Sequence, residues 1–568
     1  MSGARVPGAT RGVVVAAGLL AALLVLDVAA LLWAPLGRVG VVLWCASWLA
    51  LAVHAAGCLR RTVADARATG QGWVTLAVMA GLAALAFAGT LDSRLVHFET
   101  CHEIGCAVGH FAGDPGWGYN RTCLFNYPAR QFIVPALPTL LLGRSGFALT
   151  FGSFLYLLVA LPIFARGLLD ELAGRRHADL VTALVLTFPL HLRYFNHFMF
   201  AYEESIYPFL HALIFAGLAL QLRRRADPAL LLLAGLGMLH MVWGYTTSLA
   251  LFGLALAWLV HRLAAGPRRS QLERRAAMLV LAVTASSFAL SWLVRADFHA
   301  FGGRSAGELA ADVAEAVRHI FLAPPGASSA FMSPFLYPFV LAALLGAFAL
   351  LDGWRGLAVG AWALGVLLAA VILHGYWYYH VPLRVHRWLV ALPLLFALLA
   401  TFAGRLRAAP GWSRRLLSAL LAASIVTGGL FHHAYVWRRP PSRQLALIGF
   451  LRGRVPAGAP AGSLVLVSEL LDLDEPVRNG YANLWQFLMY FLPALDGTPV
   501  ATEESACPTV RERVAAARAP TVLLLAPADR RASACWPTAG LEPAGRFRFG
   551  GDPPLLLYRL TLPATPAP

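Results

Sequence analysis

The chain has 568 residues, of which 59% are hydrophobic and only 13% are charged, and its mean hydropathy is +0.65. A soluble protein of this length could not cover so much apolar surface with polar side chains, so most of the chain must meet lipid. All 46 basic residues are arginine, which excludes P-loop and Schiff-base mechanisms that need a lysine amine.

About thirteen apolar segments are long enough to cross a bilayer as helices, because about 20 residues at about 1.5 Å each span its hydrocarbon core. They lie at 13–33, 40–58, 73–90, 146–165, 178–192, 206–221, 229–242, 245–262, 276–294, 331–351, 355–373, 388–404 and 415–431. The first apolar run is longer than that of a cleavable signal peptide and predicts an uncleaved signal anchor. The predicted fold is an α-helical polytopic membrane bundle over 1–438, followed by a small extracytoplasmic α/β domain over 439–568.

The arginines predict the orientation of this bundle. With a cytoplasmic N-terminus, alternate loops carry most of the arginines and face the cytoplasm, as the positive-inside rule requires. These arginines are Arg60, Arg61, Arg67, Arg175, Arg176, Arg223 to Arg225, Arg268, Arg269, Arg274, Arg275, Arg405, Arg407, Arg414 and Arg415. The outer loops are then 91–145, 193–205, 295–330 and 374–387, together with the tail after about Arg438. The predicted location is the plasma (inner) membrane of a bacterium.

The cysteines agree with this orientation. Five of the seven fall in the outer loop and the tail, where disulfides persist. They are Cys101, Cys106, Cys123, Cys507 and Cys535. The sequence predicts a Cys507–Cys535 bridge and one bridge among the three loop cysteines; the alternative is that they are small unpaired apolar residues.

The loop that leaves the third segment carries an unusual density of ionisable residues, namely Asp92, His97, Glu99, His102 and Glu103. A carboxylate that is partly desolvated near the membrane has a raised pKa and suits a general base. Asp92 or Glu99 is therefore a candidate to activate an acceptor hydroxyl. Two alternatives remain: the residues only solvate the loop, or the two histidines and a carboxylate bind a divalent cation, although their spacing matches no specific metal motif.

A second acidic pair, Glu203 and Glu204, lies at the outer mouth of the sixth segment. A late outer loop carries Arg384 and Arg387 beside aromatic residues, three apart and so on one face of a helical turn. Paired guanidiniums suit a lipid-linked phosphate, while simple interfacial anchoring is the alternative. Residues 308–321 have apolar side chains at helical spacing, which predicts an amphipathic helix on the outer surface.

The tail alternates predicted strands and helices, which indicates an α/β domain. The strands are expected at 464–467, 498–502, 521–525 and in a hairpin over 545–561, with helices at 482–491 and 509–517. Since neither a phosphate-binding glycine loop nor metal-ligand spacing occurs in it, we expect a docking or lid role.

The layout of the whole chain resembles the GT-C superfamily of integral-membrane glycosyltransferases. The resemblance rests on short pieces: Asp92 and Glu99 in the first large outer loop, Asn126-Tyr-Pro128, Thr187-Phe-Pro189, Tyr202 to Tyr207 with its two glutamates, and the late Arg384 and Arg387. Two features depart from the family pattern. The acidic loop follows the third span instead of the first, and the family's adjacent acidic pair is replaced by carboxylates seven residues apart.

This resemblance implies an inverting-type transfer of a sugar from a polyprenyl-phosphate carrier to an extracytoplasmic acceptor. Asp92 or Glu99 would act on the acceptor, Glu203 or Glu204 would assist, and Arg384 and Arg387 would hold the donor phosphate. The expected partners are the lipid-linked sugar, the bilayer and an acceptor of unknown identity, with no nucleic acid. The alternatives are a lipid-linked glycan polymerase or ligase, a membrane transporter or flippase, and a non-catalytic assembly partner.

Overall fold

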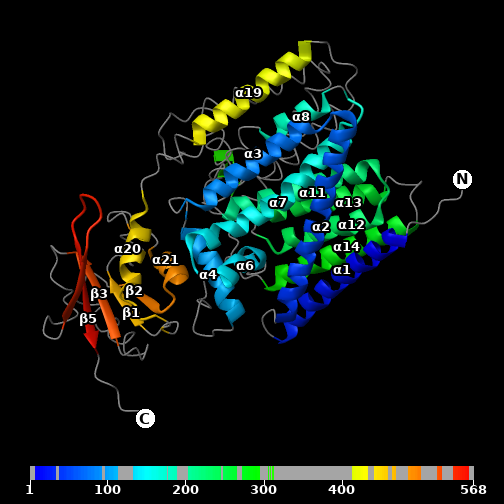
Figure 1. Ribbon diagram of the computed structural model, residues 1–568. Coiled ribbons are helices and arrows are strands. Elements are labelled where there is room, and N and C mark those ends of the chain that lie inside the picture. The colour runs from blue at the N-terminus through cyan, green and yellow to red at the C-terminus, as the bar shows by residue number, and fades with distance from the viewer. Residues whose placement is uncertain are drawn as a thin grey trace, which may run out of the picture. The chain divides into compact units, whose positions relative to one another are not determined.

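The structure is a computed structural model (Figure 1). Apart from a few isolated positions, it describes residues 7–33, 38–92, 98–112, 132–175, 177–187, 203–244, 247–264, 271–294, 412–432, 441–457, 464–468, 484–499, 521–527 and 541–561. The chain divides into two compact units, and each is described by itself below. The first comprises Met1–Gly89, Phe125–Pro135 and Phe151–Trp437, and the second comprises Thr90–Leu124, Ala136–Thr150 and Arg438–Pro568.

The described part of the first unit is helical, as the apolar segments predict. Its helices are α1 (Pro7–Trp33), α2 (Arg38–Thr69), α3 (Trp73–Thr90), most of α7 (Gly146–Glu171), α8 (Ala178–Leu186), α11 (Glu203–Arg224), α12 (Pro228–Val242), α13 (Thr247–Ala264), α14 (Gln271–Val294) and α19 (Trp412–His432). Ten of the thirteen predicted segments are therefore helices. The other three, at 331–351, 355–373 and 388–404, lie outside the described residues.

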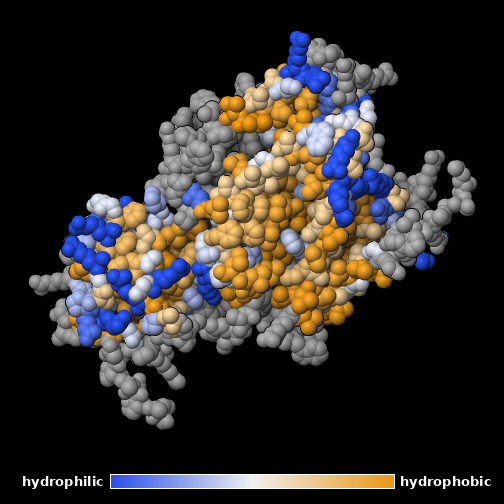
Figure 2. All heavy atoms as spheres, viewed as in Figure 1, coloured by the Kyte–Doolittle hydropathy of each residue, from blue (hydrophilic) through white to orange (hydrophobic). Residues whose placement is uncertain are grey.

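Four of the described helices are long and apolar enough to cross a membrane: α2, α3, α7 and α11. Their surroundings differ. The apolar windows of α7 and α11 are 78% and 89% buried, whereas those of α2 and α3 are only 28% and 33% buried. Exposed valines, leucines and a phenylalanine cover the outer faces of α2 and α3, and Figure 2 shows a broad apolar surface over the helices of this unit. Such a surface is stable in lipid and unfavourable in water, which supports a multi-pass membrane protein.

The interior of the first unit is built around α11 and α12. Helix α12 contacts α1, α2, α11, α13 and α14, and nearly all of its residues from Leu230 to Val242 are buried. Asp227 starts this helix: its side chain accepts hydrogen bonds from the backbone N–H groups of Ala229 and Leu230, and Pro228 occupies the first helical position, where a missing N–H costs nothing. The polar side chains described below therefore lie on helices with little freedom to move.

The second unit combines the C-terminal domain with parts of the first large loop. Its helices are α4 (Phe98–Ala112), most of α6 (Ile133–Leu142), α20 (Arg443–Arg452) and α21 (Leu484–Phe491). Its five strands are β1 (Leu464–Ser468), β2 (Leu495–Pro499), β3 (Thr521–Pro527), β4 (Glu542–Phe547) and β5 (Leu555–Thr561). The sheet order is β2-β1-β3-β5-β4.

The sheet of the second unit is mixed. Strand β1 pairs in parallel with β2 and β3, whereas β3, β5 and β4 form an antiparallel part. This confirms the predicted strands at 464–467 and 521–525, the C-terminal hairpin and the helix that ends at Phe491. The predicted strand at 498–502 begins earlier, at Leu495, and the predicted helix at 509–517 lies outside the described residues. The described helices and this sheet confirm a mostly helical chain with a small C-terminal sheet domain.

Candidate functional site

The predicted base residues flank the start of α4 in the second unit. Asp92 lies two residues after the end of α3 and is half-buried. Glu99 lies in the first turn of α4. His97 lies outside the described residues. The loop therefore contains a regular helix that the sequence analysis did not predict, because its polar residues mask its apolar face.

That face holds His102 and Glu103, which the sequence analysis grouped with the other ionisable residues of the loop. Both are buried, with exposed fractions of 4% and 3%, and His102 Nδ1 lies 3.1 Å from Glu103 Oε1. The ring of Trp485 from α21 stands edge-on to the His102 ring, with centroids 5.1 Å apart. A buried carboxylate beside an imidazole is costly unless the two are hydrogen-bonded, and this contact lies within α4 itself. No group of three or more metal-ligating side chains occurs among the described residues.

Helix α21 of the C-terminal domain packs on α4 and also contacts the α6–α7 turn. The Tyr490 hydroxyl is hydrogen-bonded to Thr139 Oγ1 at 2.8 Å and donates to the Ser145 carbonyl at 3.1 Å. The Arg144 guanidinium donates to the carbonyls of Met489 and Tyr490 at 3.1 and 3.0 Å. Burial raises the pKa of Tyr490 above its usual range, so the hydroxyl stays protonated. The contacts involve residues about 350 positions apart and hold loop and tail in one unit.

The other predicted site residues belong to the first unit or lie outside the described residues. Glu203 and Glu204 are the first two residues of α11 and belong to the first unit. Arg384 and Arg387 lie outside the described residues. The structure thus brings His102 and Glu103 together and places Asp92 and Glu99 on neighbouring elements of one unit.

Two clusters of buried polar side chains in the first unit were missed by the sequence analysis. The first cluster begins about one turn after the start of α11. Tyr207 bonds Ser153 of α7 through their hydroxyls at 3.0 Å, and its ring contacts Tyr156, with centroids 5.5 Å apart. One turn further along α11, His211 lies between Tyr156 and His240 of α12, at 5.8 Å from each. Each of these residues is an isolated polar side chain within an apolar run, so sequence patterning does not reveal it.

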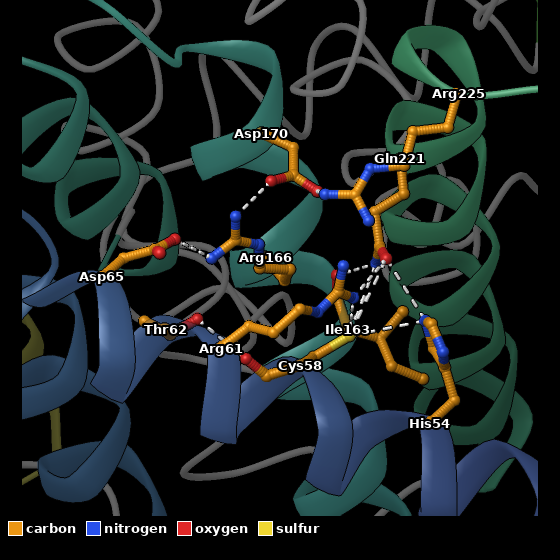
Figure 3. A network of polar contacts seen from close by, with 10 residues as sticks. All are labelled: His54, Cys58, Arg61, Thr62, Asp65, Ile163, Arg166, Asp170, Gln221 and Arg225. Atoms are coloured by element: carbon orange, nitrogen blue, oxygen red, sulfur yellow. Dashed lines mark hydrogen bonds and ion pairs between the residues drawn. The ribbon is translucent and has the colours of Figure 1, made fainter. Parts of the chain in front are cut away.

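The second cluster lies near the C-terminal ends of α2, α7 and α11 and is drawn in Figure 3. Arg166 of α7 is its centre: its guanidinium bonds Asp170 one turn later and Asp65 of α2, each at 2.5 Å. Arg225 reaches the other oxygen of Asp170 at 3.4 Å. Asp170 is 7% exposed and Asp65 is 57% exposed. The buried pair of Arg166 and Asp170 lies within α7, and the contacts with Asp65 and Arg225 connect it to neighbouring segments.

The same cluster continues toward the interior through Gln221 of α11. Its amide nitrogen donates to the Ile163 carbonyl at 3.2 Å, and its amide oxygen lies 3.2 Å from both Arg61 Nη2 and His54 Nε2 (Figure 3). Because an amide oxygen only accepts, His54 must carry its proton on Nε2. Cys58 Sγ adds contacts to His54 and Arg61 at 3.4 Å.

A third polar contact lies near the same end of the first unit. Arg262 of α13 is paired with Glu273 of α14 at 2.5 Å and donates to the backbone carbonyls of Leu222 and Arg225 at 2.9 and 3.3 Å. The guanidinium thereby satisfies carbonyls at the end of α11 that have no intrahelical partner. The C-terminal ends of α2, α7, α11 and α13 therefore meet at one end of the bundle, the end that carries the arginine-rich turns.

Of the cysteines that the structure describes, Cys45, Cys58 and Cys101 form no disulfide, whereas Cys106 is disulfide-bonded. Cys123 and the predicted Cys507–Cys535 bridge lie outside the described residues.

No protein-family model and no curated protein sequence matches this chain. Its site must therefore be interpreted from its own geometry.

Proposed function

We propose that this protein is an integral-membrane glycosyltransferase with a GT-C-like layout, which moves a sugar from a polyprenyl-phosphate carrier to an acceptor on the extracytoplasmic side. One observation carries the proposal: α21 of the C-terminal domain packs on α4, so that the acidic loop and the tail form one unit. Neither α4 nor α21 is long enough to cross a bilayer, so a loop and a tail that pack together through them lie on one side of the membrane.

The helix ends support the orientation. Helix α3 begins four residues after α2 ends. The Asp179 carboxylate, at the start of α8, accepts hydrogen bonds from the backbone N–H groups of Val74 and Thr75 in the first turn of α3. The start of α3 therefore lies at the arginine-rich end of the bundle, which the positive-inside rule assigns to the cytoplasm. The other end of α3 emerges on the opposite side, and Asp92 lies two residues after it.

In the proposed reaction, an acceptor hydroxyl attacks the anomeric carbon while the bond from that carbon to the phosphate oxygen breaks. Asp92 or Glu99 takes the hydroxyl proton, and the carrier leaves as a phosphate anion. Glu203 or Glu204 assists at the outer mouth of α11. Arg384 and Arg387 stabilise the negative charge that develops on the phosphate. Such electrostatic stabilisation of the transition state is usually the largest contribution to the rate enhancement.

The test is transfer of a radiolabelled sugar from polyprenyl phosphate by the purified full-length protein in detergent. We expect Asp92→Asn or Glu99→Gln, and separately Arg384→Ala, to depress turnover by at least about 100-fold, the scale of one general base or one charge-stabilising group. Glu542→Gln removes an exposed carboxylate of β4 and serves as the matched control. Full activity in Asp92→Asn, Glu99→Gln and the double variant would exclude this loop from the chemistry.

Substrate size separates the transferase from a polymerase or ligase. The transferase accepts a monosaccharide donor, whereas a glycan polymerase or ligase requires a lipid-linked oligosaccharide. Supplying both donors to the same preparation therefore distinguishes the two functions.

A transporter or flippase is the second candidate, and the buried polar side chains within apolar helices favour it, because such residues often mark transport pathways. His54, His211 and His240 are the relevant residues. The discriminating measurement is movement of a fluorescent polyprenyl-phosphate sugar between leaflets of sealed proteoliposomes without any sugar acceptor. Movement without transfer would favour this candidate over the transferase.

A further inference from the structure

A group of hydrogen-bonding atoms in the interior of the first unit has no hydrogen-bond partner among the residues that the structure describes. It lies where α2, α7, α11 and α12 meet, in the half of the bundle away from the arginine network. His211, His240 and Tyr156 are each at most 2% exposed. In the part of the chain that the structure describes, four of their polar atoms make no hydrogen bond: both ring nitrogens of His211, Nδ1 of His240 and the hydroxyl of Tyr156.

The hydrogen bonds around His240 determine what its unpaired atom can do. The Ser47 hydroxyl donates its only hydrogen to the Trp44 carbonyl at 2.7 Å. Its oxygen lies 3.0 Å from His240 Nε2 and must accept there, so Nε2 carries the proton. In the neutral imidazole, Nδ1 is then an acceptor that faces no donor.

His211 and Tyr156 complete the set. A neutral His211 offers one donor and one acceptor, and the Tyr156 hydroxyl can act as either. The ring contacts of 5.8 Å hold Tyr156, His211 and His240 in a row. These atoms require a partner that both donates and accepts, and buried polar groups in native proteins almost always have one.

We propose that this cluster binds a neutral hydroxyl that bridges His240 Nδ1, His211 and the Tyr156 hydroxyl. The three side chains include neither a carboxylate nor a guanidinium, and their unpaired atoms match the donor and acceptor of a hydroxyl. A hydroxyl can come from internal water, which typically makes about three hydrogen bonds to buried polar groups of this kind, or from a hydroxylated ligand such as a sugar. The site is independent of the proposed transfer reaction.

The first test is the thermal midpoint of the full-length protein in detergent after Tyr156→Phe, which removes only the hydroxyl. Tyr207→Phe is the matched control, because the Tyr207 hydroxyl has a defined partner in Ser153. If a hydroxyl is bound, Tyr156→Phe lowers the midpoint by an amount comparable to that of the control. An unchanged or raised midpoint overturns the proposal, since removal of an unsatisfied buried hydroxyl is neutral or favourable.

The second test identifies the source of the hydroxyl. The folded protein is incubated in heavy water, and exchange of the histidine ring Cε1 hydrogens is then measured by mass spectrometry of its peptides after digestion. The exposed His261 serves as the internal reference. Exchange at His211 assigns the hydroxyl to water. Protection of His211, combined with a midpoint that methyl glucoside raises in the wild type but not in Tyr156→Phe, assigns it to a hydroxylated ligand. Protection without such a rise overturns the proposal.

Discussion

Gly167 of α7 and Gly217 of α11 lie against each other in the interior of the first unit. A Cβ atom at Gly167 would come within 2.5 Å of the Gly217 carbonyl oxygen, and one at Gly217 would come equally close to the Ile163 carbonyl. Small residues at helix contacts let backbones approach closely in a membrane, where apolar burial alone does not drive association. The two most buried of the four candidate membrane spans therefore depend on glycine at these positions.

We expect Gly217→Ala to destabilise the protein by about 1–3 kcal/mol, the usual cost of overpacking a tight contact. The control is Gly253→Ala on α13, where a Cβ meets no atom within 4 Å and helix propensity favours alanine. The measurement is the thermal midpoint in detergent. Equal effects of the two substitutions would contradict the close contact.

The arginine network predicts unequal roles for its two carboxylates. Asp170→Ala leaves Arg166 charged and buried without its better-shielded partner, and we expect a loss of about 3–5 kcal/mol. Asp65→Ala removes a carboxylate that is 57% exposed, and we expect a loss of at most about 1 kcal/mol. Chemical unfolding of both variants tests this order. A larger effect at Asp65 would show that the network is not anchored at Asp170.

The start of α3 depends on a residue about 100 positions away. The Asp179 carboxylate accepts from the backbone N–H groups of Val74 and Thr75 at 3.1 and 2.8 Å, and from the Thr75 hydroxyl at 2.6 Å. We expect Asp179→Ala to cost about 0.5–2 kcal/mol, as for other helix caps. Asp179→Asn keeps one acceptor oxygen and should retain part of the stability, as hydrogen exchange of the first turn of α3 would report. Unchanged exchange in Asp179→Ala would exclude the cap.

The Tyr490 hydroxyl predicts an alkaline limit for the second unit. Burial raises its pKa in the folded protein, so the folded state holds the proton more tightly than the unfolded state does. Its contribution to stability is complete below the unfolded pKa of about 10 and is lost as the pH rises further. We expect Tyr490→Phe to be less stable than the wild type at neutral pH. Above pH about 10, its stability should decline less steeply than that of the wild type. The melting of the C-terminal sheet, followed by circular dichroism, is the measurement, with Tyr558→Phe as the control. Parallel declines in wild type and Tyr490→Phe would refute it.

The sequence by itself determined the elements whose patterns are local. Long apolar runs predicted the helices α1 to α3, α7, α8, α11 to α14 and α19, because about 20 apolar residues in succession have few other stable arrangements. Short runs of branched and leucine residues likewise predicted β1 and β3. The arginine-rich turns indicated which loops lie on the same side of the membrane. Arginines concentrate in cytoplasmic loops whatever the tertiary contacts are.

Only the tertiary structure decided which distant residues meet. The pairing of Asp179 with the start of α3, of Tyr490 with Thr139, and of Gly167 with Gly217 joins segments that no local pattern connects. Burial of His102 and Glu103, which the sequence analysis grouped with the other ionisable residues of the loop, likewise became visible only with the packing of α21 on α4. The physical reason is that hydrogen bonding and burial depend on packing between helices, whereas hydropathy records only the average environment of each segment. Single polar residues in apolar runs, such as His211 and Gln221, acquire meaning only when their neighbours are known.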